Sequence, residues 1–398
     1  MSVTTTNFAY ALKTLYPQSR VQDLVYKDHP LLAMVPKDKE FYGANMAMAV
    51  RYANPQGRSA AFSTAQTNVG NNKGVQFLLT RVSDYQVVRL TTEAIQAAEK
   101  DMGALIKALD TEMQAGINNI SASLAQSLYG DGTGAKGQSA SNSSPITLVN
   151  SNDITNFEVG MVIVAASTTT GSLRSGSGTI TAVDRDAGTI TYTGTITSLT
   201  ANDYLFTQGD APNGGANVKV SGLAAWIPSS APSSTAFFGV DRTPDVTRLG
   251  GLRVDVSALT PEEGLVTTLS KVAREGGRTS HWMCNHLFYR SIENALGAKV
   301  VYETAGMGTV SFTGLKVIGP KGSVMVYADQ DCPSARSFAL QMDTWKLASL
   351  KEAPQILDLD GNQLDRVYNA DEFEARIVYY AQLGCDAPGF NANVTNPS

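Results

Sequence analysis

Three residues in one short segment have the types that metal chemistry requires. His281, Cys284 and His286 form an HxxCxH pattern, and imidazole and thiolate groups are common zinc ligands. The letters around them, SHWMCN, are typical of a strand, in which successive side chains alternate between two faces. Residues 281 and 284 would therefore point in opposite directions, and no second pair of ligands follows. We interpret all three as core or surface residues and expect no metal site.

The other candidate motifs for chemistry are incomplete. His29 precedes a proline and is a poor candidate for the base of a hydrolase triad. Asp358, Asp360 and Asn362 lie in a DLDGN segment that resembles a calcium loop, but its glycine comes fourth where an EF-hand needs it sixth, which indicates a turn. Lys136 follows a glycine-rich stretch without the spacing of a phosphate-binding loop. We therefore expect no catalytic residue, no cofactor and no enzyme activity.

Cysteine usage and composition indicate an intracellular globular protein. Cys284, Cys332 and Cys385 share no CxxC spacing, and an odd, sparse set is typical of reduced thiols. We expect Cys284 and Cys332 to pack as small apolar groups. A hydrophobic content of 43% excludes disorder, and a net charge of −5 argues against wholesale electrostatic binding of nucleic acid. The N-terminus has no signal-peptide pattern and no apolar run could span a membrane, so we expect folding in a cytosol.

Two segments at the start of the chain are expected to reach outward. Residues 1–44 carry short apolar clusters, including HPLLAMVP, and predict an arm that docks on its own domain or on a neighbouring subunit. In residues 45–92, NMAMAVRYANP and GVQFLLTRVSDYQVVRLT alternate apolar and polar residues as strands do. The polar connection between them is too long for an ordinary loop, which predicts a protruding β-hairpin. Its charged residues are mostly basic: Arg51, Arg58, Lys73, Arg81 and Arg89 against the single acid Asp84.

Residues 93–129 give the strongest local pattern. Their apolar residues recur at spacings of three and four, as on one face of an α-helix. A helix of this length would span roughly 55 Å, with Thr92 as its N-cap and Gly130 at its end. We expect it to act as a spine that packs on a sheet. The apolar stripe consists of Ile95, Ala98, Met102, Leu105, Leu109, Met113, Ile117, Ile120, Leu124 and Leu128.

The middle of the chain predicts a separate β module. Residues 130–144, GDGTGAKGQSASNSS, have the composition of a flexible linker. Residues 145–210 contain short strand patterns at near-even spacing with turn residues between them, which is typical of a small barrel or sandwich. Glycine-rich stretches on both sides indicate an insertion.

The remaining sequence predicts an α/β domain and a final strand. Residues 211–355 alternate helix and strand patterns, including a helix over 261–276 with Thr260 as its N-cap. Residues 356–398 include EFEARIVYYAQLGC, which we expect to form one long strand that returns beside the spine helix.

This order of elements resembles that of the major capsid proteins of tailed bacteriophages, which have the HK97-type fold. HPLLAMVPK is similar to the N-terminal arm of that family. RLTTEAIQAAEKDMGALIKALDTEMQAGINNI resembles the spine helix of its peripheral domain, and VYADQDCPSARSFALQMDTWKLASLKEAPQILDLDGN resembles the later part of its axial domain. The resemblance covers most of the chain outside residues 145–210, which look like an insertion that only some members carry.

The resemblance implies an α+β capsid fold with an arm, an extended hairpin, a spine helix, an α/β axial domain and an inserted small β-barrel or sandwich. It divides the chain into an N-terminal arm (1–44), an extended hairpin or E-loop (45–92), a peripheral-domain spine helix with a linker (93–144), an inserted β domain (145–210), an axial domain (211–355) and a returning peripheral strand with a C-terminal tail (356–398).

The same resemblance implies self-assembly into hexamers and pentamers of an icosahedral virion shell, built in the host cytoplasm, that encloses double-stranded DNA without reading its sequence. Partners would be further copies of the chain, with scaffolding, portal and decoration proteins, and no membrane. A charged content of 17%, against about 25% in ordinary soluble domains, suits a subunit whose surface is buried against neighbours.

Charge suggests how neighbouring subunits would meet. A basic hairpin lying on the acidic spine helix of a neighbour has complementary fields, which orient association more than they add affinity. Many such weak contacts together give avidity. The residues that we expect at this contact are Arg51, Arg58, Lys73, Arg81, Glu93, Glu99, Asp101, Asp110 and Glu112.

The sequence departs from the family pattern in two respects, and two other classes of protein stay open. No long scaffolding segment precedes the arm, so we expect scaffolding to be separate or absent. Lys73 lies in the hairpin, but no Asn and Glu match it, so we do not predict covalent cross-linking.

One alternative is an encapsulin-like compartment protein, which shares the fold and encloses enzymes. The other is a surface β-rich binding or surface-layer protein, against which the long helix and the missing export signal count.

Overall fold

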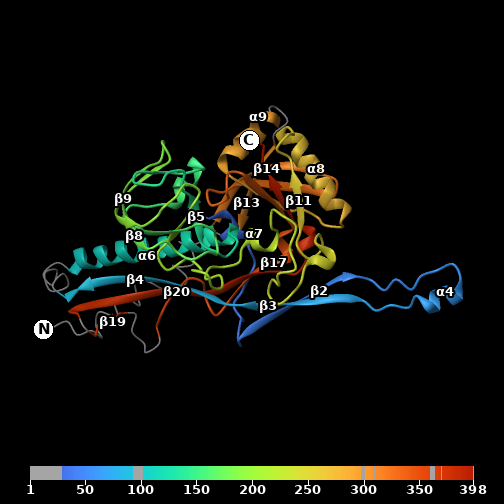
Figure 1. The fold of residues 1–398 in the computed structure, drawn as a ribbon, viewed down its shortest axis with the longest axis horizontal. Helices are drawn as coiled ribbons and strands as arrows, with labels where there is room; N and C mark the ends of the chain where they lie inside the picture. The colour runs from blue at the N-terminus through green and yellow to red at the C-terminus, as the bar shows by residue number, and fades with distance from the viewer. Residues whose placement is uncertain are drawn as a thin grey trace.

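The computed structural model describes residues 29–92, 102–296, 301–307, 310–358, 364–368 and 370–397. These residues form four sheets, which Figure 1 shows in their arrangement. A long layer of strands runs beneath helix α6, a hairpin projects from one end of this layer, and two rounded units stand above it. This mixed α+β architecture agrees with the predicted fold class.

The layer beneath α6 is a six-stranded sheet built around one long strand. This strand, β20 (Glu372–Cys385), runs antiparallel to β4 (Val82–Thr91) and, farther along, to β17 (Trp345–Ser349). The predicted long returning strand is therefore confirmed, and it lies beside the spine helix as expected. The sheet is completed by β1 (Lys37–Asp38), β18 (Gln355–Ile356) and β19 (Asp365–Arg366).

Helix α6 (Met102–Tyr129) packs along β4 and β20. At Gly116 the helix comes close to the sheet, because a Cβ there would lie only 2.8 Å from Cγ2 of Val88. The first part of the predicted helix, residues 93–101, lies outside the described residues. The apolar stripe is confirmed for the part whose side chains are described, where Met113, Ile117, Ile120, Leu124 and Leu128 are all buried.

The projecting hairpin consists of β2 (Asn45–Ala53) and β3 (Lys73–Thr80), which pair antiparallel, with the short helix α4 (Phe62–Thr67) at its tip (Figure 1). The prediction of one continuous second strand is wrong, because the chain changes sheets at Arg81. Residues before it pair with β2, and residues after it pair with β20.

A second six-stranded sheet forms the rounded unit above α6. Backbone hydrogen bonds from Ala140 to Thr147 (2.7 Å) and from Val149 to Gln138 (2.9 Å) connect its two edge strands, so the sheet closes on itself. The prediction of a flexible linker over 130–144 is wrong for its second half, because β5 pairs with β10 there. In sheet order the strands are β5 (Ala135–Gln138), β10 (Tyr204–Thr207), β7 (Val162–Ala166), β8 (Gly176–Asp184), β9 (Thr189–Ile196) and β6 (Ile146–Thr147).

The other rounded unit contains a seven-stranded sheet that packs against helices α8 (Pro261–Arg274) and α9 (His286–Leu296). Thr260 caps α8 as predicted and forms a capping box with Glu263. The C-terminal tail, which the sequence analysis did not place, joins this sheet, where β21 pairs between β11 and β16. In order the strands are β11 (Leu252–Asp255), β21 (Ala392–Thr395), β16 (Arg336–Leu340), β12 (His281–Cys284), β15 (Gly322–Ala328), β14 (Val310–Gly319) and β13 (Val301–Met307).

Short helical turns connect these units. None of the helices in the described ranges is long and apolar enough to cross a membrane. The turns are α3 (Pro30–Met34), α7 (Leu223–Trp226) and 3-10 segments at Ser151–Asn156, Thr243–Asp245, Met342–Thr344 and Pro388–Phe390.

Candidate assembly surfaces

The hairpin has a packed half and a free half. Near its base, Met48, Val50, Phe77 and Leu79 are buried, because alternate residues of the two strands face the core. Beyond this base the pattern ends, and no residue from 51 to 76 is buried. A two-stranded ribbon is only marginally stable in water without further packing. The free half therefore lacks, within its own subunit, the packing that would stabilise it.

An aromatic cluster fixes the base of the hairpin. The rings of Phe77 and Trp226 have centroids 5.1 Å apart and meet edge to face. The indole N–H of Trp226 donates to the carbonyl of Leu383 at 2.9 Å, and the backbone N–H of Leu78 donates to the carbonyl of Phe238 at 2.9 Å. These contacts join strand β3 to distant segments and set the direction in which the hairpin leaves the subunit. Pattern analysis of the sequence did not find this cluster.

The predicted basic residues divide into two groups. Arg51, Arg58 and Lys73 are exposed on the hairpin and are available to another molecule. Arg81 is half-buried at the base, where its guanidinium group donates to the carbonyl of Phe41 and lies 4.9 Å from the centre of the Phe41 ring. Arg81 thus fastens the arm segment to the hairpin within one subunit.

Of the predicted acidic residues, the structure describes the side chain of Glu112, which is exposed on α6. Asp110 lies within α6, and Glu93, Glu99 and Asp101 lie outside the described residues. The helix therefore presents at least one acid to the outside.

The tip of the hairpin is apolar as well as basic. Phe62 and Val69 flank the ends of α4 and are 78% and 76% exposed. Large apolar side chains on a protruding tip are typical of an anchor for another surface. The predicted contact residues were chosen by charge and did not include Phe62 and Val69. Both are visible in the sequence as apolar residues within a long polar stretch.

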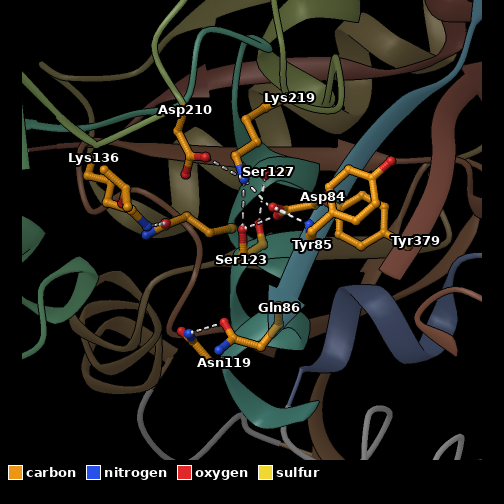
Figure 2. A network of polar contacts seen from close by, with 12 residues as sticks. Asp84, Tyr85, Gln86, Asn119, Ser123, Ser127, Lys136, Asp210, Lys219 and Tyr379 are labelled. Carbon is orange, nitrogen blue, oxygen red and sulfur yellow. Dashed lines mark hydrogen bonds and ion pairs between the residues drawn. The ribbon is translucent and has the colours of Figure 1, made fainter. Parts of the chain in front are cut away.

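A buried polar network joins the closed barrel to the layer beneath it, as Figure 2 shows. The ammonium group of Lys219 lies 2.6 Å from Oδ2 of Asp84, 3.1 Å from Oδ1 of Asp210 and 3.2 Å from Oγ of Ser123. The Tyr379 hydroxyl donates to the same oxygen of Asp84 at 3.2 Å. The network therefore links β4, α6 and β20 to the segment where the chain leaves the barrel.

Burial shifts the pKa values of three groups in and beside this network. It raises the pKa of Asp210, against the opposing effect of the Lys219 charge, and it raises the pKa of Tyr379 well above its ordinary value. It also lowers the pKa of Lys136, whose ammonium group donates to Oε1 of Gln126 at 2.6 Å. Lys136 thus ties strand β5 to α6. These contacts hold the barrel, the spine helix and the strand layer together within one subunit.

Cys284 and His281, two of the three candidate metal ligands, make contacts within the fold. Cys284 and Cys332 are buried as expected, and burial raises the pKa of both thiols, which keeps them unreactive. His281 stacks on Tyr327, and its Nδ1 lies 2.8 Å from Oγ of Ser280. No cluster of metal-ligating side chains occurs in the part of the chain that the structure describes. Of the DLDGN segment, residues 359–362 lie outside the described residues.

A family model and several solved structures match the chain. Residues 200–365 match the family model described as SU10 major capsid protein. No curated protein matches the chain. The capsid asymmetric unit of cyanophage A-1(L) matches with a TM-score of 0.56 at 11% identity, covering 93% of each chain.

Two further solved structures show weaker similarity. The capsid of a native GTA particle has a TM-score of 0.47 at 7% identity, covering 92% of this chain and 90% of that one. The holo-SrpI encapsulin complex from Synechococcus elongatus PCC 7942 has a TM-score of 0.45 at 9% identity, covering 93% and 88%. The family match and the fold shared with the cyanophage protein confirm the predicted resemblance to the major capsid proteins of tailed bacteriophages and support a structural capsid role for this chain.

Proposed function

We propose that this chain assembles into the hexamers and pentamers of an icosahedral phage head that encloses double-stranded DNA. The observation that carries the proposal is the free half of the hairpin, in which no residue from 51 to 76 is buried. Such a ribbon gains stability when it packs on a second copy of the chain. Each copy then contributes its own hairpin to one neighbour and binds the hairpin of another. The phage capsid fold supports this use of the hairpin.

The contact surface of the hairpin combines charge with an apolar anchor. Arg51, Arg58 and Lys73 supply the basic side, and Phe62 with Val69 supplies the anchor at the tip. Helix α6 of a neighbour is the proposed acidic counterpart, with the exposed Glu112 as its described member. Complementary charge would orient the hairpin, and burial of the apolar tip would supply most of the affinity.

The inserted module, which we now propose to begin at 135 instead of 145, braces its own subunit. Nδ2 of Asn150 donates to Oγ of Ser334 at 3.1 Å, which joins it to the axial unit. Three of its six acids form ion pairs, one of them with a lysine outside the module, so the module stays net acidic and would not bind DNA. The pairs are Arg174 with Asp203, Arg185 with Glu158, and Lys219 with Asp210.

Electron microscopy of the purified full-length protein tests the proposal. Large closed shells built from hexamers and pentamers are the expected result. Small shells without hexamers would favour the encapsulin-like alternative, and monomers under all assembly conditions would favour a surface-binding protein. Virions would carry the chain in their shell, after its synthesis in the host cytoplasm.

A further inference from the structure

One buried carboxylate joins three separate parts of the chain. Asp329 follows strand β15 and is 1% exposed. Its Oδ2 accepts a hydrogen bond from the Tyr129 hydroxyl at 2.7 Å and another from the Leu31 backbone N–H at 3.3 Å. Tyr129 is the last residue of α6, and Leu31 lies in α3, the short helix of the arm. The carboxylate therefore fastens the arm where the spine helix meets the axial unit.

A second carboxylate lies beside the first. The backbone N–H of Asp331 donates to Oδ1 of Asp329 at 3.0 Å, and Oδ2 of Asp331 lies 2.7 Å from Nδ1 of His29, directly before α3. The beginning of α3 thus contacts both acids at once. The other titratable groups that face this pair are the thiols of Cys284 and Cys332 and the ammonium group of Lys136.

We propose that Asp329, which accepts hydrogen bonds from Tyr129 and Leu31 and lies beside Asp331, is a proton-sensitive latch that holds the arm helix α3 more tightly in mildly acidic than in neutral or alkaline solution. If α3 left its position, Asp329 would lose the Leu31 donor and water would reach both carboxylates. Docking of the arm and protonation of Asp329 are therefore linked. This inference concerns the fold of one subunit and does not depend on the proposed function.

The direction of the pH dependence follows from burial. Desolvation, strengthened by the Asp331 charge, raises the pKa of Asp329 from 3.8 to about 6, although the hydrogen bonds from Tyr129 and Leu31 act in the opposite direction. The docked arm therefore favours the protonated carboxyl, and docking weakens as the pH rises through about 6. If undocking fully hydrates the group, the docking equilibrium changes by up to about 100-fold between pH 8 and pH 4.

Amide hydrogen exchange of the full-length protein tests the latch. Protection factors of residues 31–35, corrected for the intrinsic exchange rate at each pH, should rise several-fold or more as the pH falls from 8 to 5. Asp329→Asn removes the titration, so its protection should stay flat across this range. Asp343→Asn changes an exposed acid away from the latch and should reproduce the wild-type curve.

A second variant keeps the test independent of how well Asp329→Asn folds. Tyr129→Phe retains the ring but removes a donor that favours the ionised carboxylate, so the midpoint of the protection curve should move to higher pH. A wild-type curve that does not change with pH, a pH dependence that survives in Asp329→Asn, or an unshifted midpoint in Tyr129→Phe would each overturn the proposal.

Discussion

The ammonium group of Lys219 lies 2.6 Å from the carboxylate of Asp84, although the two residues are 135 positions apart in the sequence. Lys219 is 5% exposed, and the side chains around it come from the strand layer, the spine helix and the exit of the barrel (Figure 2). Loss of one partner from a buried pair leaves the other charge uncompensated. We expect Lys219→Met to lower the free energy of unfolding by about 3 kcal/mol, as measured by chemical denaturation of unassembled protein.

A surface ion pair provides the control for this prediction. Arg185 and Glu158 are 47% and 69% exposed, so Arg185→Met should cost less than about 1 kcal/mol. Equal losses in the two variants would show that the Lys219 network is not a junction between the units.

The two phenylalanines of the hairpin should separate folding from assembly. Phe77 is fully buried against Trp226, and Phe77→Ala should lower the free energy of unfolding by about 3–5 kcal/mol because it leaves a cavity. Phe62 is 78% exposed, so Phe62→Ala should leave the stability of the unassembled subunit unchanged and reduce shell yield. Thermal melting of subunits and sedimentation of shells measure the two effects. Normal shell yield with Phe62→Ala would exclude the tip as an anchor.

Asp153 should make the stability of the subunit depend on pH. Burial raises the pKa of this carboxyl to about 6. A raised pKa in the folded state means that its contribution to stability is complete below about pH 4 and is lost as the pH rises through about 6. Asp153→Asn can still accept the hydrogen bond from Asn150 and should gain about 1–2 kcal/mol over wild type at pH 8, but not at pH 4. Melting curves at both pH values check this, and an equal difference at both would contradict it.

Elements with strong local patterns were predictable from the sequence. The apolar stripe of α6 follows from spacings of three and four, and helix α8 follows from Thr260, Pro261 and the first-turn acids. The protruding hairpin followed from two alternating segments with a long polar connection. In each case the signal lies within one short stretch of the chain.

Features that depend on pairing between distant segments were not predictable. Strand β5 lies in a segment, residues 130–144, with the glycine and serine content of a linker, and it becomes ordered because β10 offers it backbone partners. Strand β21 lies next to β20 in sequence but pairs in another sheet. The Lys219 network and the Asp329 latch each combine segments more than 100 positions apart, and a single sequence carries no record of such proximity.

The proposed contact between the hairpin and a neighbouring helix predicts a specific effect of charge. Arg58→Glu combined with Lys73→Glu should abolish or strongly reduce shell formation at low salt, because both reversed residues would face acids. Lys321→Glu combined with Arg290→Glu changes the net charge equally on exposed positions of the axial unit and should assemble normally. High salt should reduce the difference between the two variants, because it screens exposed charges.

Charge exchange is the most direct test of the proposed mode of assembly. Asp110→Lys and Glu112→Lys on the spine helix should impair assembly alone, and their combination with Arg58→Glu and Lys73→Glu should restore it. The measurement is the fraction of protein that sediments as shells at low salt. We expect substantial recovery in the combined variant, whereas recovery no better than in either partner, or normal assembly of every single-surface variant, would contradict this mode of assembly.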